Sequence, residues 1–276
     1  MSDKIPLAGV IGSPIAHSKS PQIHRHWLKT YGLAGDYIPM DVATQDLETV
    51  LRTLPKAGFV GVNVTIPHKE AALEIADLVT DRATLIGAAN TLIFRKDGQI
   101  HADNTDGYGF LENLKAGAPG WVPSLGPAAV LGAGGAARAV VASLLDAGVP
   151  EILLSNRTRV RAEKLADDFG NRVTVVDWVQ AGNMIDDAAL VVNTTSLGMI
   201  GKQAMRVPLD GLRKGVFVTD LVYAPLRTDL LATAEEAGCI TVDGLGMLLH
   251  QAVPAFERWF GQRPEVDSAT RAAALR

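Results

Sequence analysis

The chain of 276 residues contains a single cysteine, Cys239, and therefore cannot form an intramolecular disulfide. A lone cysteine suits a reducing compartment, and we expect a cytoplasmic protein. An excess of positive charge is also missing, because 26 Lys and Arg residues stand against 30 Asp and Glu residues. The net charge of −4 argues against a general attraction to nucleic acids or to anionic membranes.

Long hydrophobic runs and metal-ligand patterns are missing as well. The most apolar stretch, residues 128–149, is interrupted by four glycines and Arg138, and falls short of the ~20 apolar residues that a membrane span needs. The six histidines show no H-E-x-x-H or Cys/His spacing, so we expect no metal site. Hydrophobic residues still make up 47% of the chain, enough for substantial cores, and the length predicts roughly two domains.

Short apolar segments alternate with amphipathic ones along the chain, which predicts an α/β fold with largely parallel sheets. Ser20 is expected to cap the first helix, with Pro21 at its first position. In the first half we expect strands at 5–11, 36–42 and 59–64, helices at 20–31, 44–54 and 67–78, and a hairpin near 90–103 that turns at Asp97-Gly98. In the second half we expect strands from 128 and near 151–155, 172–176, 190–194 and 216–220, and a helix at 244–260.

A second domain is expected to begin near residue 128, because its first strand starts there and about 100 residues precede it. The final helix carries an apolar stripe that includes Leu245, Leu249 and Phe256. This stripe is compatible with packing on either domain, and periodicity alone leaves that choice open.

A glycine-rich turn follows the strand that begins at Ala128. Gly132, Gly134 and Ala137 fit the G-x-G-x-x-G/A pattern of dinucleotide-binding proteins. The first glycine makes the tight turn, the second lets the backbone approach a pyrophosphate, and the small third residue packs helix against strand. The N-terminus of the following helix offers N–H donors to that anion. The pattern predicts a dinucleotide site.

The end of the second strand of this domain indicates which dinucleotide is bound. An NAD site usually has Asp or Glu there, to bind the ribose 2′-hydroxyl. Here Asn156, Arg157 and Thr158 follow the strand, with Arg159 and Arg161 after them. Guanidinium groups bind a 2′-phosphate through charge-assisted hydrogen bonds. The sequence therefore predicts NADP as the cofactor.

Polar clusters occur where the strands of the first half end, the usual place for a site in α/β sheets. Ser18 and Ser20 can bind a carboxylate or simply cap a helix, and Lys69 can face the strand end or solvent. Residues 103–107 can form an Asx-turn and helix cap, and Asn90 can be a turn residue. Gln251 lies in an apolar stripe, so its amide needs a partner, either a substrate hydroxyl or a backbone carbonyl.

Together these motifs resemble the shikimate dehydrogenase family. The resemblance covers nearly the whole chain, with the motifs in the family's order. The matching segments are 12–21 (GSPIAHSKSP), 63–69 (NVTIPHK), 87–91 (GAANT), 103–107 (DNTDG), 132–137 (GAGGAA), 156–158 (NRT), 193–199 (NTTSLGM), 220–223 (DLVY) and 244–247 (GLGM), followed by Gln251. His250 departs from the small or apolar residue that is common in the family.

The resemblance implies reversible, NADP-dependent reduction of 3-dehydroshikimate to shikimate, on the chorismate route to aromatic amino acids. It implies an α/β substrate domain of residues 1–104 and 242–276 with a mostly parallel sheet. A Rossmann-like NADP domain would span residues 105–241. The implied partner is a small molecule, with no nucleic acid and no membrane, and a homodimer is left open.

The resemblance also implies roles for individual residues. Lys69 would be the acid/base at the reacting oxygen and Asp106 its partner. Ser18 and Ser20 would hold the substrate carboxylate, and the remaining substrate contacts would be Thr65, Asn90, Asp106, Tyr223 and Gln251. The cofactor contacts would be Asp81, Gly132, Ala133, Gly134, Gly135, Ala136, Asn156, Arg157, Thr158, Arg161, Leu221, Gly244 and Met247.

Two other functions would share parts of this sequence pattern. A quinate/shikimate dehydrogenase would share the fold and motifs, but accept quinate and often NAD. The paired serines at 18 and 20, and the missing acidic residue after the second strand, favour shikimate and NADP. A non-catalytic NADP-binding regulator would be expected to have lost Lys69 or Asp106, and both are present.

Overall fold

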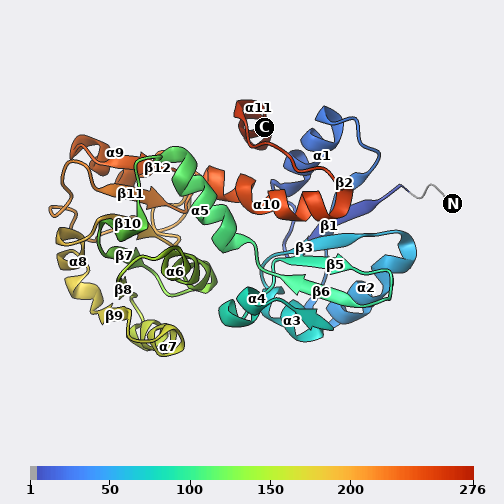
Figure 1. Cartoon of the computed structure of the whole chain (residues 1–276), viewed down its shortest axis with the longest axis horizontal. Coiled ribbons are helices and arrows are strands. Elements are labelled where there is room, and N and C mark those ends of the chain that lie inside the picture. Colours follow the sequence, from blue (N-terminus) through green and yellow to red (C-terminus); the bar gives the residue numbers. More distant parts are fainter. Residues whose placement is uncertain (1–4) are drawn as a thin grey trace. The chain divides into compact units, whose positions relative to one another are not determined.

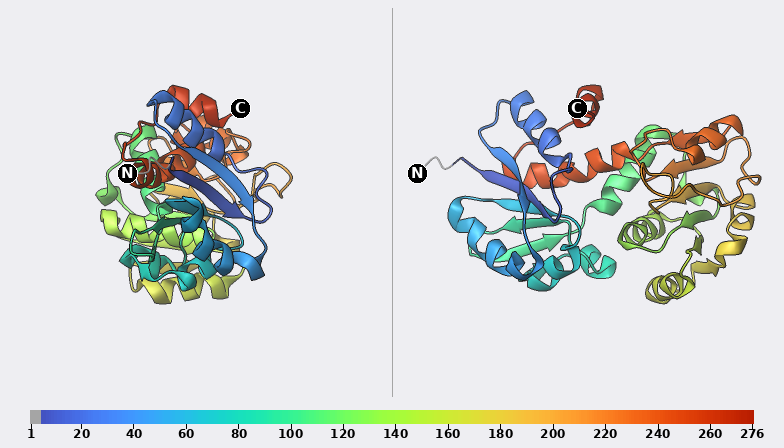
Figure 2. Two further views of the ribbon diagram at one scale, coloured as in Figure 1. Left: turned by 90° about the vertical axis from the view of Figure 1, so that its right-hand side faces the viewer. Right: turned by 180° about the vertical axis from the view of Figure 1, so that it is seen from behind.

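A computed structural model describes residues 5–276 and divides the chain into two compact units (Figures 1 and 2). The first, here the N/C unit, contains the described residues up to Thr105 and again Leu249–Arg276. The second, the central unit, is Asp106–Leu248. Within residues 5–276, no helix has both the length and the apolarity to cross a membrane.

The sheet of the N/C unit has six strands in the order β2-β1-β3-β5-β6-β4. β1 pairs in parallel with β2 and β3, and β4 with β6, while β3-β5 and β5-β6 are antiparallel. The strands are β1 (Leu7–Gly12), β2 (Asp36–Asp41), β3 (Gly61–Val64), β4 (Leu78–Val79), β5 (Thr91–Phe94) and β6 (Ile100–Asp103). The antiparallel pair β5-β6 is the predicted hairpin, which is thereby confirmed.

Helices pack on both faces of this sheet. One face packs against a cluster that includes Leu51 and Ala72, from α2 and α3. The other packs against Ala255 and Trp259, from the second half of α10, which answers the question that periodicity leaves open. The helices are α1 (Ser20–Thr30), α2 (Leu47–Thr53), α3 (Lys69–Ile75), α4 (Asp81–Ile86), α10 (Leu245–Phe260) and α11 (Ser268–Ala274), with 3-10 turns at Thr44–Asp46 and Leu54–Ala57.

The sheet of the central unit is entirely parallel, in the order β12-β11-β10-β7-β8-β9. Chain order runs outward from β7 in both directions, which is the doubly wound Rossmann arrangement. The strands are β7 (Ala128–Leu131), β8 (Ile152–Ser155), β9 (Val173–Val176), β10 (Leu190–Asn193), β11 (Phe217–Asp220) and β12 (Ile240–Val242). The predicted α/β class, with mostly parallel sheets and a Rossmann-like part, is confirmed.

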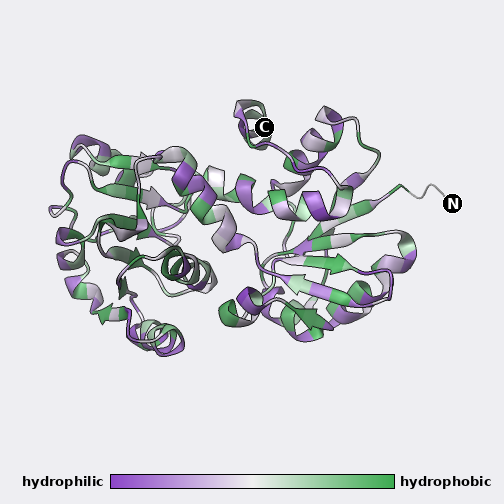
Figure 3. Cartoon of the chain, viewed as in Figure 1, coloured by the Kyte–Doolittle hydropathy of each residue, from purple (hydrophilic) through white to green (hydrophobic). Residues whose placement is uncertain are grey.

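Alternate residues of the strands serve two cores in this unit. Ala128 and Val130 of β7 face a cluster with α5, α6 and α7, while Ala129 and Leu131 face one with α8 and α9. The strands are accordingly mostly green in Figure 3, whereas α6 and α7 carry both colours. The helices are α5 (Asp106–Gly117), α6 (Gly135–Ala147), α7 (Arg159–Phe169), α8 (Asn183–Asp186) and α9 (Asp229–Glu236), with 3-10 turns at Pro123–Leu125 and Trp178–Gln180.

Two local predictions are wrong. The helix expected at 67–78 ends at Ile75, because Leu78 and Val79 pair with β6 as strand β4. Ser20 does not cap α1: it lies inside the helix, Lys19 is the cap residue, and no side chain caps that end. Instead, the Ser18 hydroxyl accepts a hydrogen bond from the Ser20 N–H, at 3.3 Å.

Candidate functional site

The polar clusters of the N/C unit meet at one edge of its sheet. The parallel strands β1 and β3 end at this edge, and the antiparallel β5 begins there. Ser18 and Ser20 therefore follow β1, Thr65 and Lys69 follow β3, and Asn90 precedes β5. Ser20 and Asn90 are buried, while Ser18, Thr65 and Lys69 are half-buried. One sheet edge thus presents hydroxyl, amide and amine groups together.

Asn90 is the centre of a buried hydrogen-bond network. Its Oδ1 accepts from the Thr105 N–H (2.9 Å), the Thr105 hydroxyl (3.1 Å) and the Thr91 hydroxyl (3.0 Å). Its Nδ2 donates to Gln251 Oε1 at 3.4 Å. Gln251 thus has a side-chain partner that neither of its predicted alternatives included. The network also fixes Thr105, the residue immediately before Asp106.

Asn63 supports Asn90 from below the sheet edge. Its Nδ2 donates to the Asn90 carbonyl (3.0 Å) and to Thr91 Oγ1 (3.1 Å), and its Oδ1 accepts from the Tyr37 hydroxyl at 2.8 Å. Tyr37 in turn stacks on His24, with ring centroids 4.0 Å apart. Sequence reasoning places Asn63 on the strand but does not find this role, because Tyr37 lies 26 residues earlier.

Burial keeps this aromatic support neutral. It lowers the pKa of His24 to about 3, and it raises the pKa of Tyr37 well above its ordinary value. Neither ring nitrogen of His24 has a hydrogen-bond partner among the described residues. The side chains behind Asn63 therefore stay uncharged at neutral pH.

Lys69 is the first residue of α3, and its position is set through the backbone. Its carbonyl accepts from the Ala89 N–H at 2.9 Å, which places the start of α3 beside Asn90. The preceding His68 is buried and its Nε2 lies 2.7 Å from the Val42 carbonyl, so this turn is held on both sides. The half-buried Lys69 is therefore located at the sheet edge rather than along a solvated helix face.

A buried carboxylate, Asp103, ends β6 and precedes the segment 104–107. Asp103 is 1% exposed and forms a two-pronged ion pair with Arg82, one hydrogen bond being 2.6 Å, and it also accepts from Thr80 and from the Asn104 N–H. Burial tends to raise the pKa of Asp103, but the Arg82 guanidinium and the other donors outweigh it and leave the pKa lowered. Asn104 is also fixed, by a 2.9 Å bond to the Ala88 carbonyl.

The glycine-rich turn of the central unit joins β7 to α6. Gly132 has φ +109°, a conformation that disfavours other residues, and a Cβ there would lie 2.5 Å from Thr194 Oγ1. Gly134 is the cap residue of α6, and no side chain caps that end. The uncapped N-terminus of α6 fits a pyrophosphate. The tight turn and the uncapped helix start are the features that a dinucleotide site requires.

Asn156 connects this turn to the end of β8. Its Oδ1 accepts from the Ala133 N–H at 3.2 Å, and its Nδ2 donates to the Thr158 carbonyl at 2.8 Å. Beyond it, Arg159 is bound by Glu163 (2.7 Å) and Asp177 (2.5 Å). The guanidinium groups of Arg157 and Arg161 have no carboxylate partner among the described residues. Of the three arginines that follow β8, Arg157 and Arg161 are therefore available for a 2′-phosphate, whereas Arg159 is engaged by carboxylates.

A second buried carboxylate, Asp220, fixes the loop after β11. It accepts from Asn193 Nδ2 (2.9 Å), the Val222 N–H (3.0 Å) and the Thr228 hydroxyl (2.7 Å). All three donors are neutral, and burial leaves the pKa of Asp220 raised. Leu221 and Tyr223 belong to this loop and are half-buried.

The predicted site residues divide between the units. The N/C unit carries Ser18, Ser20, Thr65, Lys69, Asp81, Asn90 and Gln251, and the central unit carries Asp106, Gly132, Ala133, Gly134, Gly135, Ala136, Asn156, Arg157, Thr158, Arg161, Leu221, Tyr223, Gly244 and Met247. Asp81 begins α4 and is exposed. Gly244 packs directly on Leu221, whose carbonyl occupies the space that a Cβ would need.

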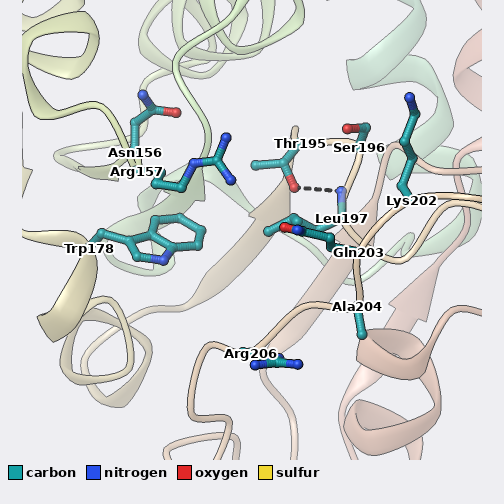
Figure 4. Close-up of a pocket in the computed structure, with 10 residues that line it drawn as sticks. All are labelled: Asn156, Arg157, Trp178, Thr195, Ser196, Leu197, Lys202, Gln203, Ala204 and Arg206. Atoms are coloured by element: carbon teal, nitrogen blue, oxygen red, sulfur yellow. Dashed lines mark hydrogen bonds between the residues drawn. The ribbon is translucent and has the colours of Figure 1, made fainter.

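A cavity of about 550 Å³ opens in the central unit at the ends of its strands (Figure 4). Asn156 and Arg157 line it after β8, Trp178 after β9, and residues 195–197 after β10. Lys202, Gln203, Ala204 and Arg206 complete the lining. Sequence reasoning misses Trp178, Lys202 and Arg206, which belong to no motif in the chain.

Comparisons with known proteins cover almost the whole chain. Residues 10–92 match the family described as Shikimate dehydrogenase substrate binding domain, residues 126–245 match Shikimate / quinate 5-dehydrogenase, and residues 244–274 match Shikimate 5'-dehydrogenase C-terminal domain. The chain is 70% identical to the Shikimate dehydrogenase (NADP(+)) of Roseobacter denitrificans, over 99% of this chain and 98% of that protein.

Two solved structures show the same architecture. Shikimate 5-dehydrogenase from Thermus thermophilus, in complex with NADP(H) and shikimate, is 40% identical, with a TM-score of 0.87 over 98% of both chains. Quinate dehydrogenase from Corynebacterium glutamicum, in complex with NAD, is 35% identical, with a TM-score of 0.91 over 98% of both chains.

Proposed function

This chain belongs to the shikimate dehydrogenase family, and on that premise we propose that it reversibly reduces 3-dehydroshikimate to shikimate with NADPH. The ketone carbon gains a hydride and its oxygen a proton, while NADPH becomes NADP⁺. The N/C unit is the proposed substrate domain and the central unit the proposed NADP domain. A cytoplasmic location completes the proposal and suits a chain with one cysteine.

The observation that carries the proposal is the polar edge of the N/C sheet. Ser18, Ser20, Thr65, Lys69 and Asn90 come from segments up to 72 residues apart in the sequence (18 to 90), and the topology brings them to one edge. Hydroxyl and amide groups of this kind suit a small polyhydroxylated acid. We assign the two serines to the substrate carboxylate and the threonine, Asn90 and Gln251 to its ring hydroxyls, with a further contact from Tyr223.

Lys69 is the proposed acid/base. NADPH, when bound, supplies the hydride, so negative charge grows on the carbonyl oxygen as the hydride arrives. An ammonium group stabilises that charge and donates the proton, and in the reverse direction the amine accepts it. Asp106 is the proposed partner that orients Lys69. It follows Thr105, which the Asn90 network holds at the same sheet edge.

The residues of the central unit fit NADP. The tight turn at Gly132 and the uncapped N-terminus of α6 suit the close approach of a pyrophosphate. Arg157 and Arg161 lack carboxylate partners in the described chain, as expected for residues that bind a phosphate. Leu221, Gly244 and Met247 are the proposed contacts of the nicotinamide end, and Asp81 is a further proposed cofactor contact.

A spectrophotometric assay at 340 nm tests the proposal, with shikimate and quinate each paired with NADP⁺ and NAD⁺. We expect the highest kcat/KM with shikimate and NADP⁺. Comparable values with quinate or NAD⁺ would instead indicate the broader quinate/shikimate enzyme, a possibility that the structural similarity to an NAD-bound quinate dehydrogenase makes worth testing. No turnover with any pair would contradict an enzymatic function.

A further inference from the structure

The cavity in the central unit is lined by cations and by no carboxylate. Three of its lining residues, Arg157, Lys202 and Arg206, are cationic, and none is acidic. All three are exposed, and their side chains form no ion pair with any residue that the structure describes. Asp177, next to Trp178 in the chain, is engaged by Arg159 instead. A cavity lined by three cations and by no carboxylate suits an anionic ligand.

The cations approach the cavity from different parts of the chain. Figure 4 shows Arg157 and Trp178 on one side and residues 195–197 with Gln203 on the other. Lys202 and Arg206 come from the segment between β10 and β11. Backbone bonds fix that segment, since the Ile200 N–H donates to the Ala224 carbonyl and the Gly198 N–H to the Gln203 carbonyl, both at 2.9 Å.

Trp178 gives the cavity an aromatic wall. Its ring is half-buried, packs against the core on the α8-α9 face, and also lines the cavity. The other three tryptophans are buried, with 1% (Trp27), 7% (Trp121) and 6% (Trp259) exposed. An indole beside unpaired cations and the hydroxyls of Thr195 and Ser196 suits a flat heterocycle that carries a phosphate.

On the proposed NADP function, the β8 end of this cavity, with Arg157, takes the adenosine 2′-phosphate. We infer that Lys202 and Arg206, which line the same cavity from the segment between β10 and β11, are additional specificity-determining cations for that phosphate. The inference rests on the proposed NADP function and extends it to residues outside every motif of the chain. Arg157 binds the phosphate from the β8 side, and Trp178 packs against the adenine. NAD lacks the 2′-phosphate, so it cannot form these interactions with Arg157, Lys202 or Arg206.

Calorimetry with adenosine 2′,5′-bisphosphate and adenosine 5′-monophosphate tests the inference on the full-length chain. For Lys202→Gln and Arg206→Gln we expect about tenfold weaker binding of the bisphosphate per lost charge-assisted hydrogen bond, with the monophosphate affinity changed less than about twofold. Lys214→Gln is the matched control. Lys214 is exposed and precedes the opposite end of β11, so both affinities are expected to stay at the wild-type value.

Tryptophan fluorescence locates the ligand independently. Because Trp178 is the one tryptophan that is not buried, the bisphosphate is expected to change the emission of the wild-type chain but not that of Trp178→Phe. An equal change in both chains would place the ligand elsewhere. Inorganic phosphate is the second probe, and if it displaced the bisphosphate at equal concentration, the cavity would be a general anion site and the inference would be wrong.

The two proposals fail in different ways. If Arg206→Gln and Lys202→Gln bind the bisphosphate as tightly as the wild type while wild-type turnover still prefers NADP⁺, the inference fails and the proposed function stands. If the wild type binds neither nucleotide and turns over no substrate, the proposed function fails. Arg157→Gln serves as the positive control, because its loss of bisphosphate affinity is expected from the motif alone.

Discussion

Asp103 and Asp220 occupy equivalent places in the two units and experience opposite surroundings. Each ends a strand, β6 or β11, and each is at most 1% exposed. Asp103 has the Arg82 guanidinium beside it and a lowered pKa, whereas Asp220 has only neutral donors and a raised pKa. The N/C unit therefore neutralises its buried charge internally. The central unit surrounds Asp220 with neutral donors, while three of its cations, Arg157, Lys202 and Arg206, line the cavity.

The same contrast distinguishes the proposed substrate-binding residues from the proposed cofactor-binding residues. Apart from Lys69 and Asp106, the proposed substrate side consists of neutral groups, and several of them are buried and bond to one another, with Asn63, Asn90 and Thr105 as examples. The cofactor side is built from exposed cations, Arg157, Lys202 and Arg206, without partners in the described chain. Preorganised neutral groups give binding that salt affects little, whereas exposed charges are screened. Substrate affinity is thus expected to depend less on ionic strength than NADP⁺ affinity.

The largest effect is expected from Lys69→Ala, which removes the charged group of the substrate side. We expect kcat to fall by about 10²–10⁴, the usual contribution of a positioned proton donor. Lys56→Ala, at an exposed position of the same unit, is the matched control and is expected to retain activity. Steady-state kinetics with saturating shikimate and NADP⁺ measures both variants. A kcat for Lys69→Ala equal to the wild type would remove Lys69 from the mechanism.

An intermediate effect is expected from Arg82→Met, which leaves Asp103 without its nearest cation. A buried charged group that loses its partner costs roughly 1–3 kcal/mol, and Arg82 itself is about half exposed, so the lower part of that range is expected. The contribution of Asp103 is present above its ordinary pKa of 3.8 and is lost as the pH falls through its lowered pKa in the fold.

Urea unfolding of Arg82→Met at pH 7 and pH 3 measures this effect. The variant should lose stability at pH 7 and approach the wild type at pH 3. The same loss at both values would mean that Arg82 acts through packing rather than charge. Arg95→Met, which breaks an exposed pair with Asp97, is the control and should change stability little.

The smallest effect is expected from Asp220→Asn, and it has the opposite sign. Because burial raises the pKa of Asp220, its ionisation opposes folding: its stabilising contribution is complete below pH 3.8 and declines as the pH rises through the raised value. The asparagine variant lacks this decline. The free energy of unfolding is measured from pH 3 to pH 8 in both chains. The difference between variant and wild type should shift in favour of the variant as the pH rises. Identical slopes would show that Asp220 titrates normally.

Local sequence patterns predict much of the fold, because many turns, strands and helices depend on residues that are close together in the sequence. The strand-turn-helix at Gly132 and the hairpin at Asp97-Gly98 are readable from neighbouring residues. The end of α3 is not, because Leu78 becomes a strand only through its pairing with His101. In that case a distant partner outweighs helical periodicity.

The candidate site is partly readable for the same reason. Motifs bring Lys69, Asn90 and Arg157 to attention, but the contacts that hold Asn90 come from residues far apart in sequence, such as Gln251. Trp178, Lys202 and Arg206 have no spacing that distinguishes them from ordinary surface residues. They are found only because the Rossmann topology gathers the ends of β8, β9 and β10 around one cavity.

The bonds of Asn156 have a consequence for redesigning cofactor preference. One side chain links the backbone of the turn at Ala133 to the end of β8 at Thr158. Asn156 therefore connects the turn proposed to bind the pyrophosphate to the end of β8, while the cations proposed to select the 2′-phosphate, Arg157, Lys202 and Arg206, are separate side chains. A change of preference from NADP to NAD is therefore expected to need substitutions at these cations and none at Asn156. Cofactor selectivity can then change while the backbone of the site stays the same.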